Sequence, residues 1–128
     1  MKKIILSIFA LVIFSANIFS QQKVTVTLDY GNEKEAETYQ VDWYEGMTVM
    51  TALQKCVTIS TYPVKDYVFV KTINNTSNIR GENAWYYTVN NKSTGKLAYL
   101  LNIKPNDTIQ WTYKKEVCSG TVDKKCEK

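Results

Sequence analysis

The 128-residue chain contains no histidine and only three cysteines. Histidine is the commonest general base and the usual activator of a serine or cysteine nucleophile, so acid–base chemistry would fall to carboxylates, lysines or tyrosines. Three thiols without histidine are too few for a structural zinc site. The sequence also lacks a glycine-rich phosphate loop and a catalytic-triad pattern. It therefore predicts no catalytic residue, no metal, no resident cofactor and no enzyme; an enzyme that uses carboxylates alone is the remaining catalytic alternative.

Charge of one sign is not in large excess either. The chain has 16 basic and 12 acidic residues, and two of the lysines fall within the first twenty residues. The remainder carries 14 basic and 12 acidic side chains, a net charge near +2. This is too weak an excess to indicate nucleic acid or an anionic membrane surface as a partner.

Long apolar runs are confined to the N-terminus. Lys2 and Lys3 precede an apolar stretch, residues 4–14, which only Ser7 interrupts, and small side chains follow as far as Ser20. This arrangement is typical of a secretory signal peptide cleaved after Ser20. The alternative is an uncleaved anchor, but the stretch is shorter than the roughly 20 residues that a span needs. The sequence thus predicts export to the periplasm, the cell surface or the medium, with no membrane span after cleavage.

Cysteine usage is compatible with export. Cys118 and Cys126 bracket a short polar loop near the C-terminus, and an oxidising compartment makes them candidates for a disulfide. Cys56 lies in a predicted helix, where a thiol more often serves as a small buried apolar residue than as a reactive group. A rival pairing of Cys56 with Cys118 stays open.

The first half of the chain changes its periodicity once. Alternating apolar residues predict strands over residues 23–28 and 39–43, and turn chemistry between them predicts an antiparallel hairpin. After Gly46 the apolar residues follow helical spacing, which predicts a helix over residues 48–58 with Thr48 as its N-cap. We expect turn-prone residues after this helix, as far as Pro63, which cannot continue it.

The second half returns to strands. Apolar and aromatic runs predict three strands, over residues 67–73, 84–89 and 108–113. A short edge segment is predicted over residues 99–101. An asparagine-rich turn is expected over residues 74–81, and another turn over residues 105–107. Asn90 and Asn91 tolerate the positive φ that a type I′ turn requires.

This order of strand, strand, helix and further strands is the β-grasp order. We therefore predict an α+β, β-grasp (ubiquitin-like) domain, a mixed sheet with one packed helix, over residues 21–115. It would follow a signal peptide at residues 1–20 and precede a polar, lysine-rich tail at residues 116–128.

Three stretches carry a resemblance to a known family. They are GMTV at residues 46–49, NIRG at 78–81 followed by WYYTVN at 85–90, and PNDTIQWTY at 105–113. In this order and spacing they resemble the transcobalamin-like C-terminal domain family, a β-grasp module of exported bacterial proteins, over residues 23–113. Asn91 and Asn106 stand where the family has glycine, and asparagine is the usual substitute at positive φ.

The resemblance implies a non-catalytic binding role. In the family's vitamin carriers this domain closes over cobalamin against a separate helical domain, which makes a corrinoid such as cobalamin one candidate ligand. Other members are modules of envelope proteins, which makes a cell-envelope protein a second candidate partner. Such a resemblance supports the fold further than it supports any one ligand.

Spare aromatic rings indicate where binding would occur. Trp85, Tyr86 and Tyr87 occupy consecutive strand positions, so they cannot all share one face, and which of them packs under the helix is open. Aromatic faces beside asparagine side chains suit flat or sugar-like ligands and protein partners alike. We predict a ligand-binding surface made by Asn78, Arg80, Trp85, Tyr86 and Asn90. The alternative is an interaction or adhesion module that pairs through an exposed sheet edge.

Overall fold

A computed structural model describes residues 21–116. The predicted signal peptide, nearly all of the predicted tail, and both Cys118 and Cys126 lie outside the described residues. Within the described range the chain is α+β and mostly strands, as predicted. Its elements are β1 (Lys23–Asp29), β2 (Glu37–Asp42), α1 (Val49–Cys56), β3 (Ile59–Val64), β4 (Tyr67–Ile73), β5 (Thr76–Ser77), β6 (Asn83–Val89) and β7 (Thr108–Lys115).

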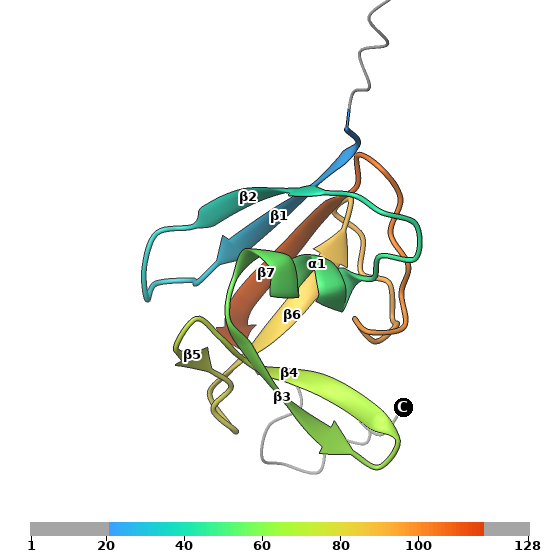
Figure 1. Ribbon diagram of the computed structural model, residues 1–128. Coiled ribbons are helices and arrows are strands. Elements are labelled where there is room, and N and C mark those ends of the chain that lie inside the picture. Colours follow the sequence, from blue (N-terminus) through green and yellow to red (C-terminus); the bar gives the residue numbers. More distant parts are fainter. Residues whose placement is uncertain (1–20, 117–128) are drawn as a thin grey trace, which may run out of the picture.

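The larger sheet has four strands in the order β2-β1-β7-β6. β1 and β2 form the predicted antiparallel hairpin, with Val26 opposite Tyr39. β7, the last strand of the chain, lies parallel to β1 at the centre of the sheet, with Ile109 opposite Val26, and pairs antiparallel with β6 on its other side. Figure 1 shows α1 across one face of this sheet.

The two central strands alternate between that covered face and the opposite face. Their apolar members are buried: Val24, Val26, Leu28, Ile109, Trp111 and Tyr113. The residues between them are polar and remain half-exposed or exposed, as Thr25, Thr27 and Gln110 illustrate. Fully burying one such apolar side chain contributes about 1.5–3 kcal/mol, which fixes the register because a one-residue slip would expose the whole set.

Thr48 is the N-cap of α1, as predicted. The backbone N–H of Thr51 donates to Thr48 Oγ1 (3.2 Å), and the backbone N–H of Thr48 donates to Thr51 Oγ1 (2.7 Å). This reciprocal pair satisfies two donors that a helix start would otherwise leave without partners. The helix ends at Cys56, and Val57 is extended, so α1 is shorter than the predicted helix.

Replacing the capping hydroxyl should have a measurable cost. We expect Thr48→Ala to lower the free energy of unfolding by about 1 kcal/mol, the usual effect of losing an N-cap side chain. Urea denaturation of the variant measures this. Thr58→Ala is the matched control, because Thr58 is exposed and follows the helix. Equal stabilities for the two variants would show that the cap does not contribute.

The second sheet has three strands in the order β3-β4-β5, and part of it was not predicted. Residues 59–64 form β3, where the sequence indicated a turn up to Pro63, so that expectation was wrong. β3 lies at the edge of its sheet, where the missing N–H of Pro63 costs no ladder hydrogen bond. The predicted edge segment at residues 99–101 is not a strand, and β5 falls inside the predicted turn at 74–81.

The two sheets are joined through β5. The indole Nε1–H of Trp85 donates to the carbonyl of Thr76 (2.8 Å), and the Tyr113 hydroxyl donates to the carbonyl of Ser77 (2.7 Å). The turn before β5 has Asn74 and Asn75 at positive φ, 48° and 58°. Because β5 is held in this way, the β3–β4 hairpin extends beyond the end of the larger sheet (Figure 1).

Candidate functional site

A groove of about 750 Å³ lies between the β3–β4 hairpin and the larger sheet. Three buried or half-buried aromatic residues of β6 and β7 form its floor: Trp85, Tyr87 and Trp111. One wall comes from the hairpin, and the other from residues 93–98. Ligand sites of roughly 300–1,000 Å³ are typical for small molecules, so the groove has the size of a ligand site.

The hairpin wall is aromatic and aliphatic. Tyr62 of β3 lies opposite Phe69 of β4, and their rings stack with centroids 5.6 Å apart and planes 26° apart. Val68 and Val70 of β4 complete this wall. Tyr62 is 37% exposed and lines the groove, so its side chain is accessible to a ligand there.

The opposite wall, residues 93–98, is held in place by three contacts. The Tyr87 hydroxyl donates to the carbonyl of Lys96 and lies 2.9 Å from Thr94 Oγ1. The backbone N–H of Met50, in the first turn of α1, donates to the carbonyl of Ala98 (3.0 Å). A further bond, from the Tyr99 hydroxyl to the carbonyl of Asp66 (3.2 Å), ties this segment to the tip of the hairpin.

The rim of the groove is mostly cationic. Lys71, Arg80 and Lys96 line it with exposed side chains, and Glu116 is the one carboxylate among the lining residues. Glu116 Oε2 accepts a hydrogen bond from the backbone N–H of Gly81 (2.7 Å). The lining therefore has a formal excess of two positive charges.

The floor contains one donor without an acceptor. Trp111 is 3% exposed, and its Nε1 is the one buried side-chain nitrogen or oxygen of the described residues for which no hydrogen-bond partner is present. By contrast, Trp43 Nε1 donates to the carbonyl of Ile103 (2.9 Å), and Trp85 Nε1 donates to Thr76. Buried N–H groups are nearly always paired in native proteins, so this exception requires an explanation.

Four of the five predicted site residues line the groove, namely Asn78, Arg80, Trp85 and Tyr86. Asn78 and Trp85 also have structural roles. Asn78 Nδ2 donates to the carbonyl of Val70 (3.0 Å), and Asn78 Oδ1 accepts from the backbone N–H of Trp85 (2.8 Å). Tyr86 follows Trp85 on the edge strand β6, so its side chain lies on the opposite face of the sheet. Lys114 Nζ lies 5.2 Å from the centre of the Tyr86 ring.

Asn90 lies elsewhere and does not line the groove. Its side chain donates to Asp107 Oδ1 (2.9 Å) and accepts from the backbone N–H of Thr108 (2.9 Å). Asn90 and Asn91 have φ values of 51° and 66°, as the predicted type I′ turn requires. Asn90 therefore joins two turns instead of facing the other four residues.

The sequence prediction missed most of the groove. Its unpredicted lining includes Tyr62, Phe69, Tyr87, Trp111 and the segment 93–98. Tyr62 lies in the stretch up to Pro63 for which the sequence predicts a turn, and Trp111 lies in the strand predicted over residues 108–113, without being predicted as a site residue. The alternation of Trp111 with Gln110 and Thr112 predicts a buried face, but it does not reveal which element that face meets.

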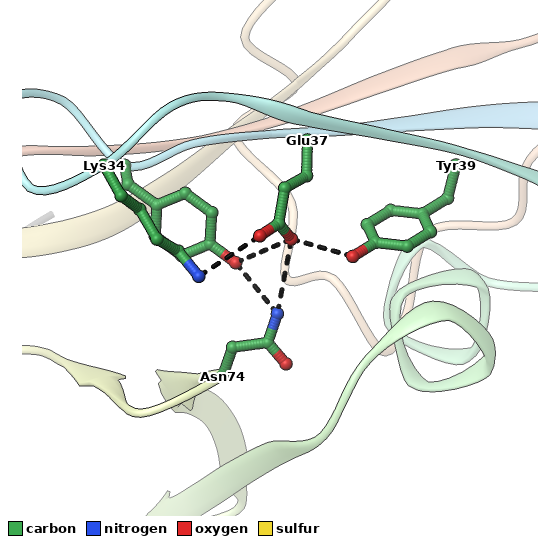
Figure 2. A network of polar contacts seen from close by, with 5 residues as sticks. Lys34, Glu37, Tyr39 and Asn74 are labelled. Atoms are coloured by element: carbon green, nitrogen blue, oxygen red, sulfur yellow. Dashed lines mark hydrogen bonds and ion pairs between the residues drawn. The ribbon is translucent and has the colours of Figure 1, made fainter.

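A second group of polar side chains joins the first hairpin to the smaller sheet. Figure 2 shows Glu37 at its centre, with Lys34, Tyr39 and Asn74 around it. Glu37 accepts from the hydroxyls of Tyr39 (2.7 Å) and Tyr30 (3.2 Å), and it pairs with Lys34 Nζ at 3.2 Å. Asn74 Nδ2 donates to the Tyr30 hydroxyl (2.9 Å). This group of contacts is structural, since its partners saturate the carboxylate.

The same contacts shift two pKa values in opposite directions. The hydrogen bond from Tyr39 is the main cause that holds the pKa of Glu37 below its ordinary value. The bond to Glu37 is likewise the main cause that raises the pKa of Tyr39 to about 12. Each shift favours the state in which an ionised carboxylate accepts from a neutral phenol.

These shifts predict two pH windows of lower stability. The folded-state pKa of Glu37 lies below the unfolded one, so its stabilisation is complete above pH 4.5 and is lost as the pH falls through the folded-state pKa. For Tyr39 the contribution is complete below pH 10 and is lost as the pH rises toward about 12. Glu37→Gln should reduce the change in the free energy of unfolding with pH in both windows, as measured by urea denaturation at each pH. Glu35→Gln, an exposed control, should preserve them, and equal acid slopes for the two variants would contradict this assignment.

The described residues offer no other obvious chemistry. Residues 21–116 contain no group of three or more acidic, cysteine or histidine side chains that could hold a metal ion. In the same range no helix has the length and apolar character needed to cross a membrane. Cys56 donates its thiol to the carbonyl of Ala52 (3.3 Å), and burial raises its pKa to about 11. Its rival pairing with Cys118 involves a residue outside the described range.

Comparisons with known proteins identify the family and support the fold. No curated protein sequence matches the chain. Among solved structures, a proposed metal-binding protein from Ruminococcus gnavus ATCC 29149 is similar, with a TM-score of 0.64 and 15% sequence identity. The match covers 75% of this chain and 99% of that one, and at this identity it establishes a shared fold alone. The sequence profile of one family, described as Domain of unknown function (DUF4430), matches residues 46–115, more than half of the chain. The chain belongs to this DUF4430 family.

Proposed function

We propose that this protein is an exported, non-catalytic binding module that holds a small ligand in the groove between the β3–β4 hairpin and the larger sheet. The observation that carries the proposal is the groove itself, whose walls and floor combine stacked and buried aromatic rings with a cationic rim. An apolar cavity with a few polar groups around it is the usual form of a small-molecule site.

The finer identity belongs to the same proposal. The order β2-β1-β7-β6, with parallel β1 and β7 and a helix over one face, supports a β-grasp domain of the transcobalamin-like kind. The apolar stretch after Lys2 and Lys3 supports export by a signal peptide. A corrinoid such as cobalamin is the candidate ligand that follows from the resemblance.

A neutral apolar probe tests the groove without assuming a ligand. We expect N-phenyl-1-naphthylamine, whose fluorescence rises in apolar surroundings, to bind the purified protein saturably at one site. Tyr62→Ala removes half of the stacked pair on the wall and should weaken binding about tenfold, which corresponds to about 1.4 kcal/mol. Tyr44→Ala is the matched control, because Tyr44 is 42% exposed but lies outside the groove lining.

The outcomes separate the groove from the particular ligand. Absence of probe binding, or equal weakening by the two tyrosine variants, would contradict the groove proposal. Equilibrium dialysis with cobalamin and cobinamide addresses the corrinoid separately. No retention at micromolar concentrations would eliminate corrinoids and leave the groove result standing.

One observation favours a second function, strand addition by an envelope partner. β5 pairs with β4 only at Thr72 and Ile73. Beyond these residues Asn78 continues the contact by binding the carbonyls of Lys71 and Val70. In the described part of the chain no strand pairs with the rest of β4 on that side, which leaves an edge that an extended segment could join. Sedimentation tests the self-pairing form, which predicts a dimer whose fraction rises with protein concentration.

A further inference from the structure

We infer that the ligand of this groove is an anionic amphiphile: an apolar or aromatic body along the Tyr62–Phe69 wall, with an oxygen anion at the end where Lys96 and Trp111 meet Tyr87. This inference rests on the proposed function of the groove, and it names a ligand class other than the corrinoid that the resemblance suggests. Three observations carry it, namely the charge of the lining, the unpaired indole donor, and the contacts that bring the two together.

The charge of the lining selects against a cationic ligand and favours an anion. Lys71, Arg80 and Lys96 are exposed around a cavity whose one lining carboxylate, Glu116, already accepts a backbone hydrogen bond. Low-dielectric aromatic walls beside such cations strengthen their attraction for an anion inside the groove. Salt should weaken this attraction, since about 0.15 M salt screens charges beyond roughly 8 Å.

The indole of Trp111 provides a donor for the same anion. It lines the groove, it is buried, and no acceptor faces its Nε1–H among the described residues. A buried donor gains much more from an acceptor than an exposed donor does, because solvent does not compete for it there. An ionised oxygen is the strongest acceptor available to it.

Tyr87 brings these two features to one end of the groove. Its ring lies 5.1 Å from that of Trp111, and its hydroxyl donates to the backbone carbonyl of Lys96. Tyr87 thus connects Trp111 to the backbone of Lys96, and we place the anion of the ligand, a carboxylate, sulfonate or phosphate, at this end of the groove. The stacked rings of Tyr62 and Phe69 remain for the apolar body.

Two fluorescent probes that share one ring system test the inference. N-phenyl-1-naphthylamine is neutral, and 8-anilinonaphthalene-1-sulfonate carries an added sulfonate. We expect the sulfonate to bind at least about tenfold more tightly at low salt, the effect of one charge-assisted hydrogen bond. This preference should shrink in 1 M sodium chloride. Because the neutral probe is the more apolar of the two, a generic apolar patch would give the reverse order.

Point variants locate the anion. Lys96→Gln and Trp111→Phe should each weaken sulfonate binding severalfold more than they weaken neutral-probe binding, because each removes a polar partner of the anion. Lys104→Gln removes an exposed charge outside the groove lining and should change neither probe. Thermal unfolding of every variant verifies that the fold is retained.

The indole signals give a readout independent of affinity. A ¹⁵N spectrum of the protein has three tryptophan indole N–H signals, from Trp43, Trp85 and Trp111. We expect the Trp111 signal to move downfield when the sulfonate binds and to move little with the neutral probe. The Trp43 donor, which lies outside the groove lining and already bonds the carbonyl of Ile103, should stay in place.

Each result decides a separate claim. If the neutral probe does not bind at all, the proposed function fails. If it binds but the sulfonate shows no advantage, or an advantage that salt does not reduce, the anionic class is wrong. If the advantage persists in both Lys96→Gln and Trp111→Phe with a stationary Trp111 signal, the anion lies elsewhere and the inference is overturned.

Discussion

Trp85→Ala is expected to lower the free energy of unfolding by about 3–5 kcal/mol, the range for removing a buried aromatic side chain from a core. Trp85 is 6% exposed, and its ring packs against Tyr30 and Tyr113 with centroids 5.3 and 5.2 Å apart. Its Nε1–H also holds β5 through the carbonyl of Thr76. The substitution therefore opens a cavity and releases the smaller sheet from the larger one.

Urea denaturation of three proteins tests this prediction. Trp85→Phe preserves an aromatic ring but not the indole donor, so its stability should fall between those of the parent protein and Trp85→Ala. A loss below about 1 kcal/mol for Trp85→Ala, the level of an average point substitution, would show that Trp85 is not the anchor between the sheets. Because this residue supports the fold, binding experiments on its variants would not isolate a ligand contact.

Asn78→Ala is expected to cost about 2–3 kcal/mol, because it leaves two backbone groups without partners. One is the carbonyl of Val70 in β4, and the other is the backbone N–H of Trp85 in β6. The single amide of Asn78 thus connects the two sheets beside the groove. Asn78→Asp preserves the size and the acceptor but replaces the donor to Val70, so it should lose a large part of the same stability.

Asn90→Gly is the matched comparison for Asn78. Asn90 also makes two side-chain hydrogen bonds, but it is exposed, and glycine preserves its positive φ. Water can replace the lost contacts there, so we expect a cost of about 1 kcal/mol or less. Equal losses for the two asparagine variants in urea titrations would show that burial beside the groove does not distinguish them.

The sequence predicted the larger sheet well, because its signals are local. Period-2 alternation predicted β1 and β2, apolar and aromatic runs predicted β6 and β7, and Thr48 predicted the helix start. The alternation of buried residues in β1 continues for one residue pair beyond the strand predicted over residues 23–28. Tyr30 continues the buried series Val24, Val26 and Leu28, and it is fully buried, although it lay in a predicted turn.

β3 could not be predicted in the same way. Its residues after Ile59 are all exposed, so no buried face imposes a periodicity on them. Pro63 is permitted because the strand lies at a sheet edge, and that fact depends on tertiary structure. The turn prediction was therefore reasonable from local chemistry and wrong in the folded protein.

The candidate site was predicted only in part, because only part of it comes from one continuous segment. That segment contains four lining residues that are close in sequence, namely Asn78, Arg80, Trp85 and Tyr86. The opposite walls, Tyr62 with Phe69 and the segment 93–98, meet this segment only when the second sheet folds against the first. Trp111 lies in the strand predicted over residues 108–113, and only its surroundings in the folded protein show that its indole nitrogen is unpaired.

The central claim is that the groove between the hairpin and the larger sheet is where this protein binds its ligand. The most direct measurement is a map of backbone amide shifts in ¹⁵N spectra recorded with saturating N-phenyl-1-naphthylamine. The claim predicts that the largest shifts cluster at residues 68–71, 85–87 and 94–98, which line the groove. Shifts concentrated instead on the polar face, at Thr25, Thr27 and Gln110, would contradict it.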